Sequence, residues 1–164
     1  MTYSIGGARG TVEDVELTIK RAREWASKCG SEILLADARL VFGRDHIESA
    51  VRHGSRAAAA GSMEARSVSM ETLRYLAAEK QVADALRVAG IREGTNRLAV
   101  VIFGTGSLGE AVSALGWVRD DSVLDARDKD LEGLGVQSVE RGTVPSDRVQ
   151  DLALERVALV DIEK

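Results

Sequence analysis

The residues whose types and spacing come closest to a chemical motif are GTGSLG, at Gly104–Gly109. They match G-x-G-x-x-G, a turn whose backbone N–H groups hold the pyrophosphate of a dinucleotide at the start of a helix. Asp125 follows at roughly the spacing of the acidic residue that binds the ribose. However, helices and a strand are expected before the motif, and no convincing strand leads into Asp125. A structural turn is the preferred interpretation, and an NAD(P)-binding oxidoreductase using this turn is the alternative.

The other reactive side chains form no catalytic or metal-binding set. His46 and His53 share a helical face, but two turns separate them by roughly 10 Å, too far for one metal ion. The only cysteine, Cys29, has no histidine near it in the sequence that could activate it as a nucleophile. The acidic residues of 120–132 lack the spacing of a calcium loop. No catalytic residue, metal or cofactor is assigned.

Charge is distributed unevenly along the 164 residues. The net charge of −4 argues against a generic nucleic-acid-binding protein, because such proteins are usually basic. Residues 39–97, however, carry ten Lys or Arg against seven Asp or Glu, whereas residues 98–164 carry seven against thirteen. The middle segment can therefore hold a local anion-binding surface on an acidic protein. A solvated, arginine-rich helix face is the alternative for the same residues.

Length and composition indicate one domain, residues 1–164. The 45% hydrophobic and 29% charged residues are typical of a soluble globular protein. No linker-like stretch supports a second domain. No apolar run approaches the ~20 residues that cross a bilayer, and no secretory signal is expected at the start. One lone cysteine fits a reducing, cytoplasmic location.

The elements that position these residues are predicted from hydrophobic spacing. Strands are expected at Tyr3–Ile5 (ending in a turn at Gly6-Gly7), 33–36, 98–103 and 152–162. Helices are expected at 11–28 (N-cap Thr11), 45–60 (capped by Asp45) and 107–115, with short ones around 128–134 and 136–141. The predicted fold class is therefore α/β (α+β), a single domain with a small mixed β-sheet covered by helices.

Residues 69–90 predict two short helices with a break near Ala78–Glu79. At ~100° per residue, the apolar residues before the break lie nearly opposite those after it. One straight helix would therefore expose one of the two sets. Lys80 and Gln81 fall at the start of the second helix, where a cation opposes the helix dipole. This position favours a role for Lys80 other than helix stability.

Helix 45–60 has two distinct faces. The residues of its apolar stripe become smaller along the helix, ending with Gly54, Ala57 and Ala58. Such small side chains predict close packing against a neighbouring element. The opposite face is expected to present polar side chains, namely His46, Ser49, His53 and Arg56.

Three stretches carry a resemblance to a known family. They run from Leu35 through Ala50, from Met70 through Ile91, and from Leu154 through Asp161. The second, METLRYLAAEKQVADA followed by Gly90-Ile91, is the most specific. Together they resemble the small accessory subunit of the KEOPS complex, called the PRPK-binding protein family in animals, and particularly its archaeal members. The resemblance covers most of residues 32–104 and the last segment.

The resemblance implies a protein that is not an enzyme. It would be a non-catalytic subunit of KEOPS, which makes threonylcarbamoyladenosine in tRNA. Its partners would be the Bud-type atypical kinase, through it the Kae-type ATPase-fold subunit, and the single-stranded 3′ CCA end of tRNA. The implied RNA-binding residues are Lys80 and Gln81, with Arg52, His53, Arg56 and Arg74 as further candidates. Leu86 and Ile91 are the candidates for partner contact. No cofactor, metal or membrane is implied.

Overall fold

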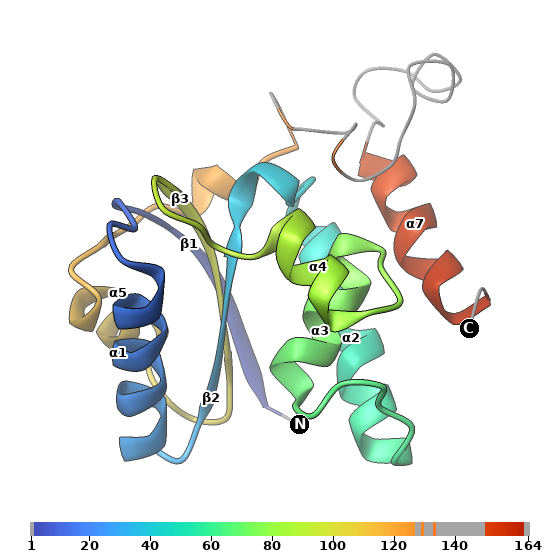
Figure 1. The fold of residues 1–164 in the computed structure, drawn as a ribbon, viewed down its shortest axis with the longest axis horizontal. Coiled ribbons are helices and arrows are strands. Elements are labelled where there is room, and N and C mark those ends of the chain that lie inside the picture. The colour runs from blue at the N-terminus through green and yellow to red at the C-terminus, as the bar shows by residue number, and fades with distance from the viewer. Residues whose placement is uncertain (1, 127–128, 130–132, 134–149, 163–164) are drawn as a thin grey trace. The chain divides into compact units, whose positions relative to one another are not determined.

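The computed structural model describes residues 2–126, 129, 133 and 150–162 (Figure 1). The chain divides into two compact units. Unit 1 comprises Met1–Ala38 and Gly90–Leu124, and unit 2 comprises Arg39–Ala89 and Asp125–Lys164. Unit 1 contains a β-sheet, and unit 2 contains helices that carry most of the candidate residues.

The sheet of unit 1 consists of β1 (Tyr3–Arg9), β2 (Glu32–Asp37), β3 (Arg97–Phe103) and β4 (Val118–Arg119), in the order β2-β3-β1-β4. β3 is one of the two inner strands, and its Val101 pairs with Leu34 of β2 and with Ile5 of β1. The predicted α/β class and the strands at 33–36 and 98–103 are confirmed. All pairings between described strands are antiparallel, so the sheet is not the predicted parallel and antiparallel mixture.

The strand β1 continues through Gly6 and Gly7, where the sequence predicted a turn. A Cβ atom at Gly6 would lie 2.8 Å from the guanidinium of Arg119, and one at Gly7 would lie 2.5 Å from the carbonyl oxygen of Asp120. These glycines therefore permit the close approach of the segment that follows α5 (Leu108–Ala114), including the 3₁₀ helix η2 (Asp121–Leu124).

Two helices of unit 1 lie against one face of its sheet (Figure 1). They are α1 (Val15–Lys28) and α5, and both contribute to a core with Leu98, Val100 and Ile102 of β3. The helix predicted at 11–28 starts four residues later. Its N-cap is Asp14 rather than Thr11, because the Asp14 carboxylate accepts a hydrogen bond from the Leu17 backbone N–H at 3.0 Å.

The 3₁₀ helix η1 (Ala38–Leu40) spans the boundary at which unit 2 begins. Unit 2 then contains α2 (Arg44–Ala60), α3 (Val68–Ala77), α4 (Val82–Ala89) and α7 (Gln150–Ile162). The N-cap of α2 is Gly43, without a side-chain bond, rather than Asp45. The close packing predicted from the small stripe is confirmed: a Cβ at Gly54 would lie 3.1 Å from the Thr72 backbone nitrogen of α3.

The final segment, predicted as a strand at 152–162, is the helix α7. Its buried residues Leu152, Ala153, Val157 and Val160 lie on one helical face. The run from Val157 through Val160 is apolar and partly β-branched, and a short run of this kind does not separate a strand from a buried helix by periodicity alone. Packing against α2 and α3 decides in favour of the helix.

The helices predicted around 128–134 and 136–141 fall almost wholly outside the described residues. Among the helices that are described, none has the length and apolarity needed to cross a bilayer.

Candidate functional site

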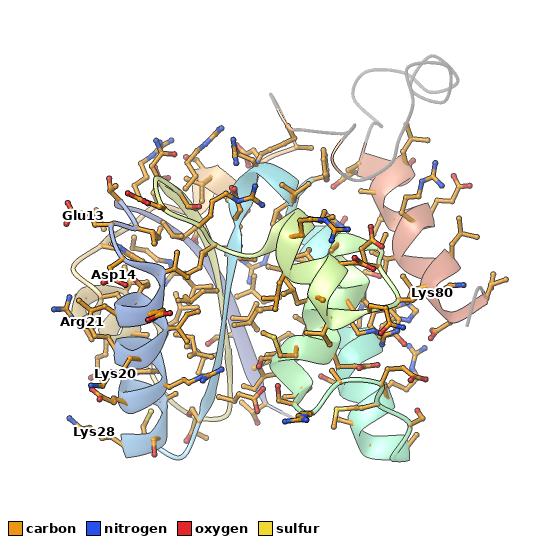
Figure 2. The ribbon with its side chains drawn as sticks, in the orientation of Figure 1. Glu13, Asp14, Lys20, Arg21, Lys28 and Lys80 are labelled. Carbon is orange, nitrogen blue, oxygen red and sulfur yellow. The ribbon has the colours of Figure 1, made fainter. Side chains whose placement is uncertain are left out.

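Lys80 and Gln81 are exposed in the turn between α3 and α4. Lys80 is labelled in Figure 2. The C-cap of α3 is Ala78, which adopts a left-handed conformation with φ 56°. The backbone N–H groups of Ala78 and Glu79 donate to the carbonyls of Tyr75 and Arg74 at 3.1 and 2.9 Å. This is the hydrogen-bond pattern that ends a helix in a tight turn. The predicted break near Ala78–Glu79 is confirmed.

Lys80 has no carboxylate partner among the residues that the structure describes. Its neighbour Glu79 is half-buried, and desolvation together with the Asp84 carboxylate raises the Glu79 pKa. The turn therefore combines one free cation with a carboxyl group whose negative charge is disfavoured. Lys80 is the group at this turn that can attract an anion.

Arg74, a candidate for RNA contact, is buried instead. Only 1% of the residue is exposed, because its guanidinium lies under the turn that it supports. Its Nη1 donates to Glu71 Oε1 at 2.6 Å, and its Nε donates to the Lys80 carbonyl oxygen at 2.6 Å. Arg74 is therefore not available at the surface for direct contact with RNA, and its role in this structure is internal.

The outer face of α2 carries two of the other candidates. Arg52 and Arg56 are exposed and one turn apart, and no described acidic residue pairs with either. His46, expected on the same face, is completely buried. The prediction for His46 is wrong because the N-terminal turn of α2 lies against the end of α3.

His46 connects two backbone segments through its ring. The Phe42 N–H donates to Nδ1 at 3.0 Å, and Nε2 lies 3.2 Å from the Leu76 carbonyl oxygen, to which it donates in the neutral ring. Burial lowers the pKa of His46 from 6.5 to about 4, although the bond to Leu76 acts in the opposite direction. With both nitrogens bonded to the backbone, His46 has none left for a ligand.

His53 is a member of a cluster that attaches α7 to the rest of unit 2. The Asp161 carboxylate accepts from the Tyr75 hydroxyl at 2.5 Å and lies 3.0 Å from His53 Nδ1. The rings of His53 and Tyr75 are 5.0 Å apart. Burial, and then the bond to Asp161, raises the pKa of Tyr75. His53 is thus engaged by an acid, unlike Arg52 and Arg56.

The two partner-contact candidates differ in exposure. Leu86 is 46% exposed on α4. Ile91 is half-buried and packs against the core of unit 1. Of the two, Leu86 offers the larger apolar surface to a partner.

The glycine-rich turn after β3 has a structural explanation. A Cβ at Gly104 or Gly106 would lie 2.8 or 2.9 Å from the Ser31 hydroxyl, and the Gly106 N–H donates to that hydroxyl at 3.0 Å. The turn follows a strand with antiparallel neighbours, whereas the dinucleotide fingerprint belongs to a parallel βαβ unit. The geometry gives no support to the oxidoreductase alternative. Among the described residues, no group of three His, Cys, Asp or Glu side chains could hold a metal ion.

Comparison with known families gives a match over residues 13–155 to the family described as kinase binding protein CGI-121. The chain belongs to this family. A comparison with curated proteins finds no match. The matched range of the CGI-121 family contains every candidate residue from Arg52 through Ile91, whereas β1 and Asp161 lie outside it. The family name indicates a kinase partner and does not favour a dinucleotide-dependent enzyme.

Sequence reasoning missed three residues that shape this site, namely Glu71, Tyr75 and Asp161. The spacing of Glu71 and Arg74 is visible in the sequence as an ion pair on one helix, but its burial is not. Asp161 is 86 residues from Tyr75 and 108 from His53, and no local pattern predicts such pairs.

Proposed function

We propose that this chain is a cytoplasmic, non-catalytic subunit of a KEOPS complex of the archaeal type. In this role it binds the Bud-type kinase subunit, is linked through it to the Kae-type subunit, and captures tRNA by the 3′ CCA end. Membership of the CGI-121 family supports the kinase partner. The resemblance of residues 70–91 to the KEOPS accessory subunit extends the proposal to tRNA.

The observation that carries the RNA-binding part is the exposed Lys80 on a turn that hydrogen bonds fix in place. A single-stranded tail is bound through cations near its phosphates and through contacts with its unpaired bases. Lys80 supplies the cation, and the amide of Gln81 can both donate to and accept from a base. Arg52 and Arg56, exposed on α2 of the same unit, are further phosphate-binding candidates.

The kinase-binding part is supported by the apolar side chain of Leu86. Large apolar residues at the centre of an interface often dominate the binding energy. Leu86 is exposed on a short helix whose inner residues Ala85 and Ala89 are fully buried. A partner that covers Leu86 would therefore meet a helix that is already packed in place.

The test of the RNA-binding part is a gel-shift titration of the full-length protein with tRNA and with tRNA lacking its CCA end. Lys80→Glu should weaken binding of the complete tRNA by at least about tenfold, since it replaces attraction to a phosphate with repulsion. Lys20→Glu is the matched control, because Lys20 is an exposed lysine on α1 of unit 1 (Figure 2). Equal affinity of the Lys80→Glu and Lys20→Glu proteins would show that the RNA site is wrong.

The test of the kinase-binding part is co-purification with the native kinase subunit. Leu86→Asp should abolish retention of the kinase, because a carboxylate would be buried in an apolar contact. Leu17→Asp is the matched control, since Leu17 is similarly exposed, at 42%, on α1. If Leu86→Asp retains as much kinase as Leu17→Asp does, Leu86 lies outside the interface.

A further inference from the structure

A buried ion pair runs along one side of α3. Glu71 is 0% and Arg74 1% exposed, and Arg74 is among the largest fully buried side chains. The Glu71 carboxylate accepts three hydrogen bonds: from Arg74 through Oε1, and from the backbone N–H groups of Glu64 and Ala65 through Oε2 at 3.0 and 2.8 Å. Every partner of this carboxylate is thus a specific donor from unit 2.

Stability alone does not explain a pair of this kind. The desolvation of two charges can cost more than their mutual attraction returns, and well-packed apolar residues in their place are often equally or more stable. The pair does, however, reach two loops at once. Glu71 holds the segment before α3, and Arg74 Nε donates to the Lys80 carbonyl at 2.6 Å in the turn after α3.

We propose that Arg74, oriented by Glu71, is a positioning residue for Lys80. This inference rests on the proposed RNA-binding function. The bond from Arg74 directs the Lys80 carbonyl inward, and the Lys80 side chain remains in solvent. Fixing the backbone of a residue in one conformation costs conformational entropy. A turn that is ordered before binding does not incur this cost when RNA arrives.

The chemistry of arginine suits this role and that of lysine does not. The planar guanidinium presents Nη1 to Glu71 and Nε to Lys80 at the same time, in a fixed geometry. A lysine ammonium at this position is a point charge without the fork. Arg74 itself is too deeply buried to touch RNA, so it acts through Lys80.

The test is a double-mutant cycle on the full-length protein, with the dissociation constant for CCA-ended tRNA as the readout. The variants are Lys80→Ala, Arg74→Met and the double variant. If Arg74 acts through Lys80, each single change raises the dissociation constant. Adding Lys80→Ala to Arg74→Met should then raise the dissociation constant by less than about twofold. Additive effects of the two changes would overturn the positioning role while leaving Lys80 as an RNA contact.

Two further measurements keep this test independent of folding. Arg74→Lys keeps the positive charge but loses the fork, so it should weaken tRNA binding about as much as Arg74→Met does while co-purification of the kinase is unchanged. Amide hydrogen exchange at residues 79–82 should accelerate in Arg74→Lys and not in the control Arg87→Lys, whose arginine is exposed on α4. Unchanged exchange and affinity in Arg74→Lys would overturn the positioning role. No effect of Lys80→Ala alone would overturn the RNA site as well.

Discussion

Protonation of His46 opposes folding. Its ring is neutral in the folded protein because burial lowers its pKa from 6.5 to about 4. In the unfolded chain the same ring is solvated and takes up a proton near its ordinary pKa. Between these two values the unfolded state binds more protons, so the free energy of unfolding decreases as the pH falls.

From this difference we predict a loss of stability between pH 6.5 and 4. The loss should approach about 3 kcal/mol at the lower end, because each pKa unit corresponds to about 1.4 kcal/mol. Urea unfolding at several pH values in this range measures it. The His46→Gln variant is the control: it should be less stable at neutral pH but should lose less stability on acidification. Parallel pH profiles for the two proteins would contradict the assignment.

Ala78 is the one described residue other than glycine with a positive φ, 56°. A left-handed conformation costs an L-residue roughly 1–2 kcal/mol. Glycine removes this strain, but it also raises the entropy of the unfolded chain, which offsets part of the stabilisation. We predict that Ala78→Gly stabilises the protein by about 0.5–1 kcal/mol, measured by urea or thermal unfolding. The same substitution at exposed Ala59, in the last turn of α2, should instead be destabilising, because glycine has a low helix propensity.

At the scale of elements, the attachment of α7 combines apolar packing with one polar cluster. Leu152, Ala153, Val157 and Val160 are buried, and Asp161 near the end of the helix binds Tyr75 and His53. The apolar residues specify the helical face, and Asp161 specifies where the last turn lies against α2 and α3.

We predict that Asp161→Ala loosens the end of α7 without unfolding unit 2. The expected cost is about 1 kcal/mol, since the carboxylate is partly exposed and water replaces some of its interactions. Amide exchange of the last turn of α7 should accelerate. Glu155→Ala on the same helix, at an exposed position, should leave that exchange unchanged. Equal protection in both variants would show that apolar packing alone holds the helix.

Across the whole molecule, the proposed RNA-binding residues lie in a segment with an excess of positive charge, whereas the rest of the chain is acidic. The net charge is −4, although residues 39–97 carry an excess of cations. An acidic protein repels bulk RNA, and binding is then confined to local cations. If Lys80, Arg52 and Arg56 are the residues that contact RNA, about three phosphates are neutralised.

This small number predicts a weak dependence of tRNA affinity on salt. For single strands, the slope of log affinity against log salt is about −0.7 for each neutralised phosphate. Contacts by Lys80, Arg52 and Arg56 together would give a slope of about −2, and Lys80→Ala should make it shallower by about 0.7. Titrations between about 50 and 200 mM salt measure both values. A slope that Lys80→Ala leaves unchanged would contradict a phosphate contact at this residue.

Features that depend only on neighbours along the chain can be predicted from the sequence. The strand at 98–103, the break at Ala78 with Lys80 just after it, and the small-residue stripe of α2 follow from local spacing of apolar residues and from helix-ending signals. Tertiary packing decided the rest. It made residues 152–162 a helix, extended β1 through two glycines, and buried His46 and Arg74. Polar side chains of this kind are stable inside a protein only when partners from distant segments satisfy their hydrogen bonds. The presence of such partners is a property of the folded chain and not of any local pattern.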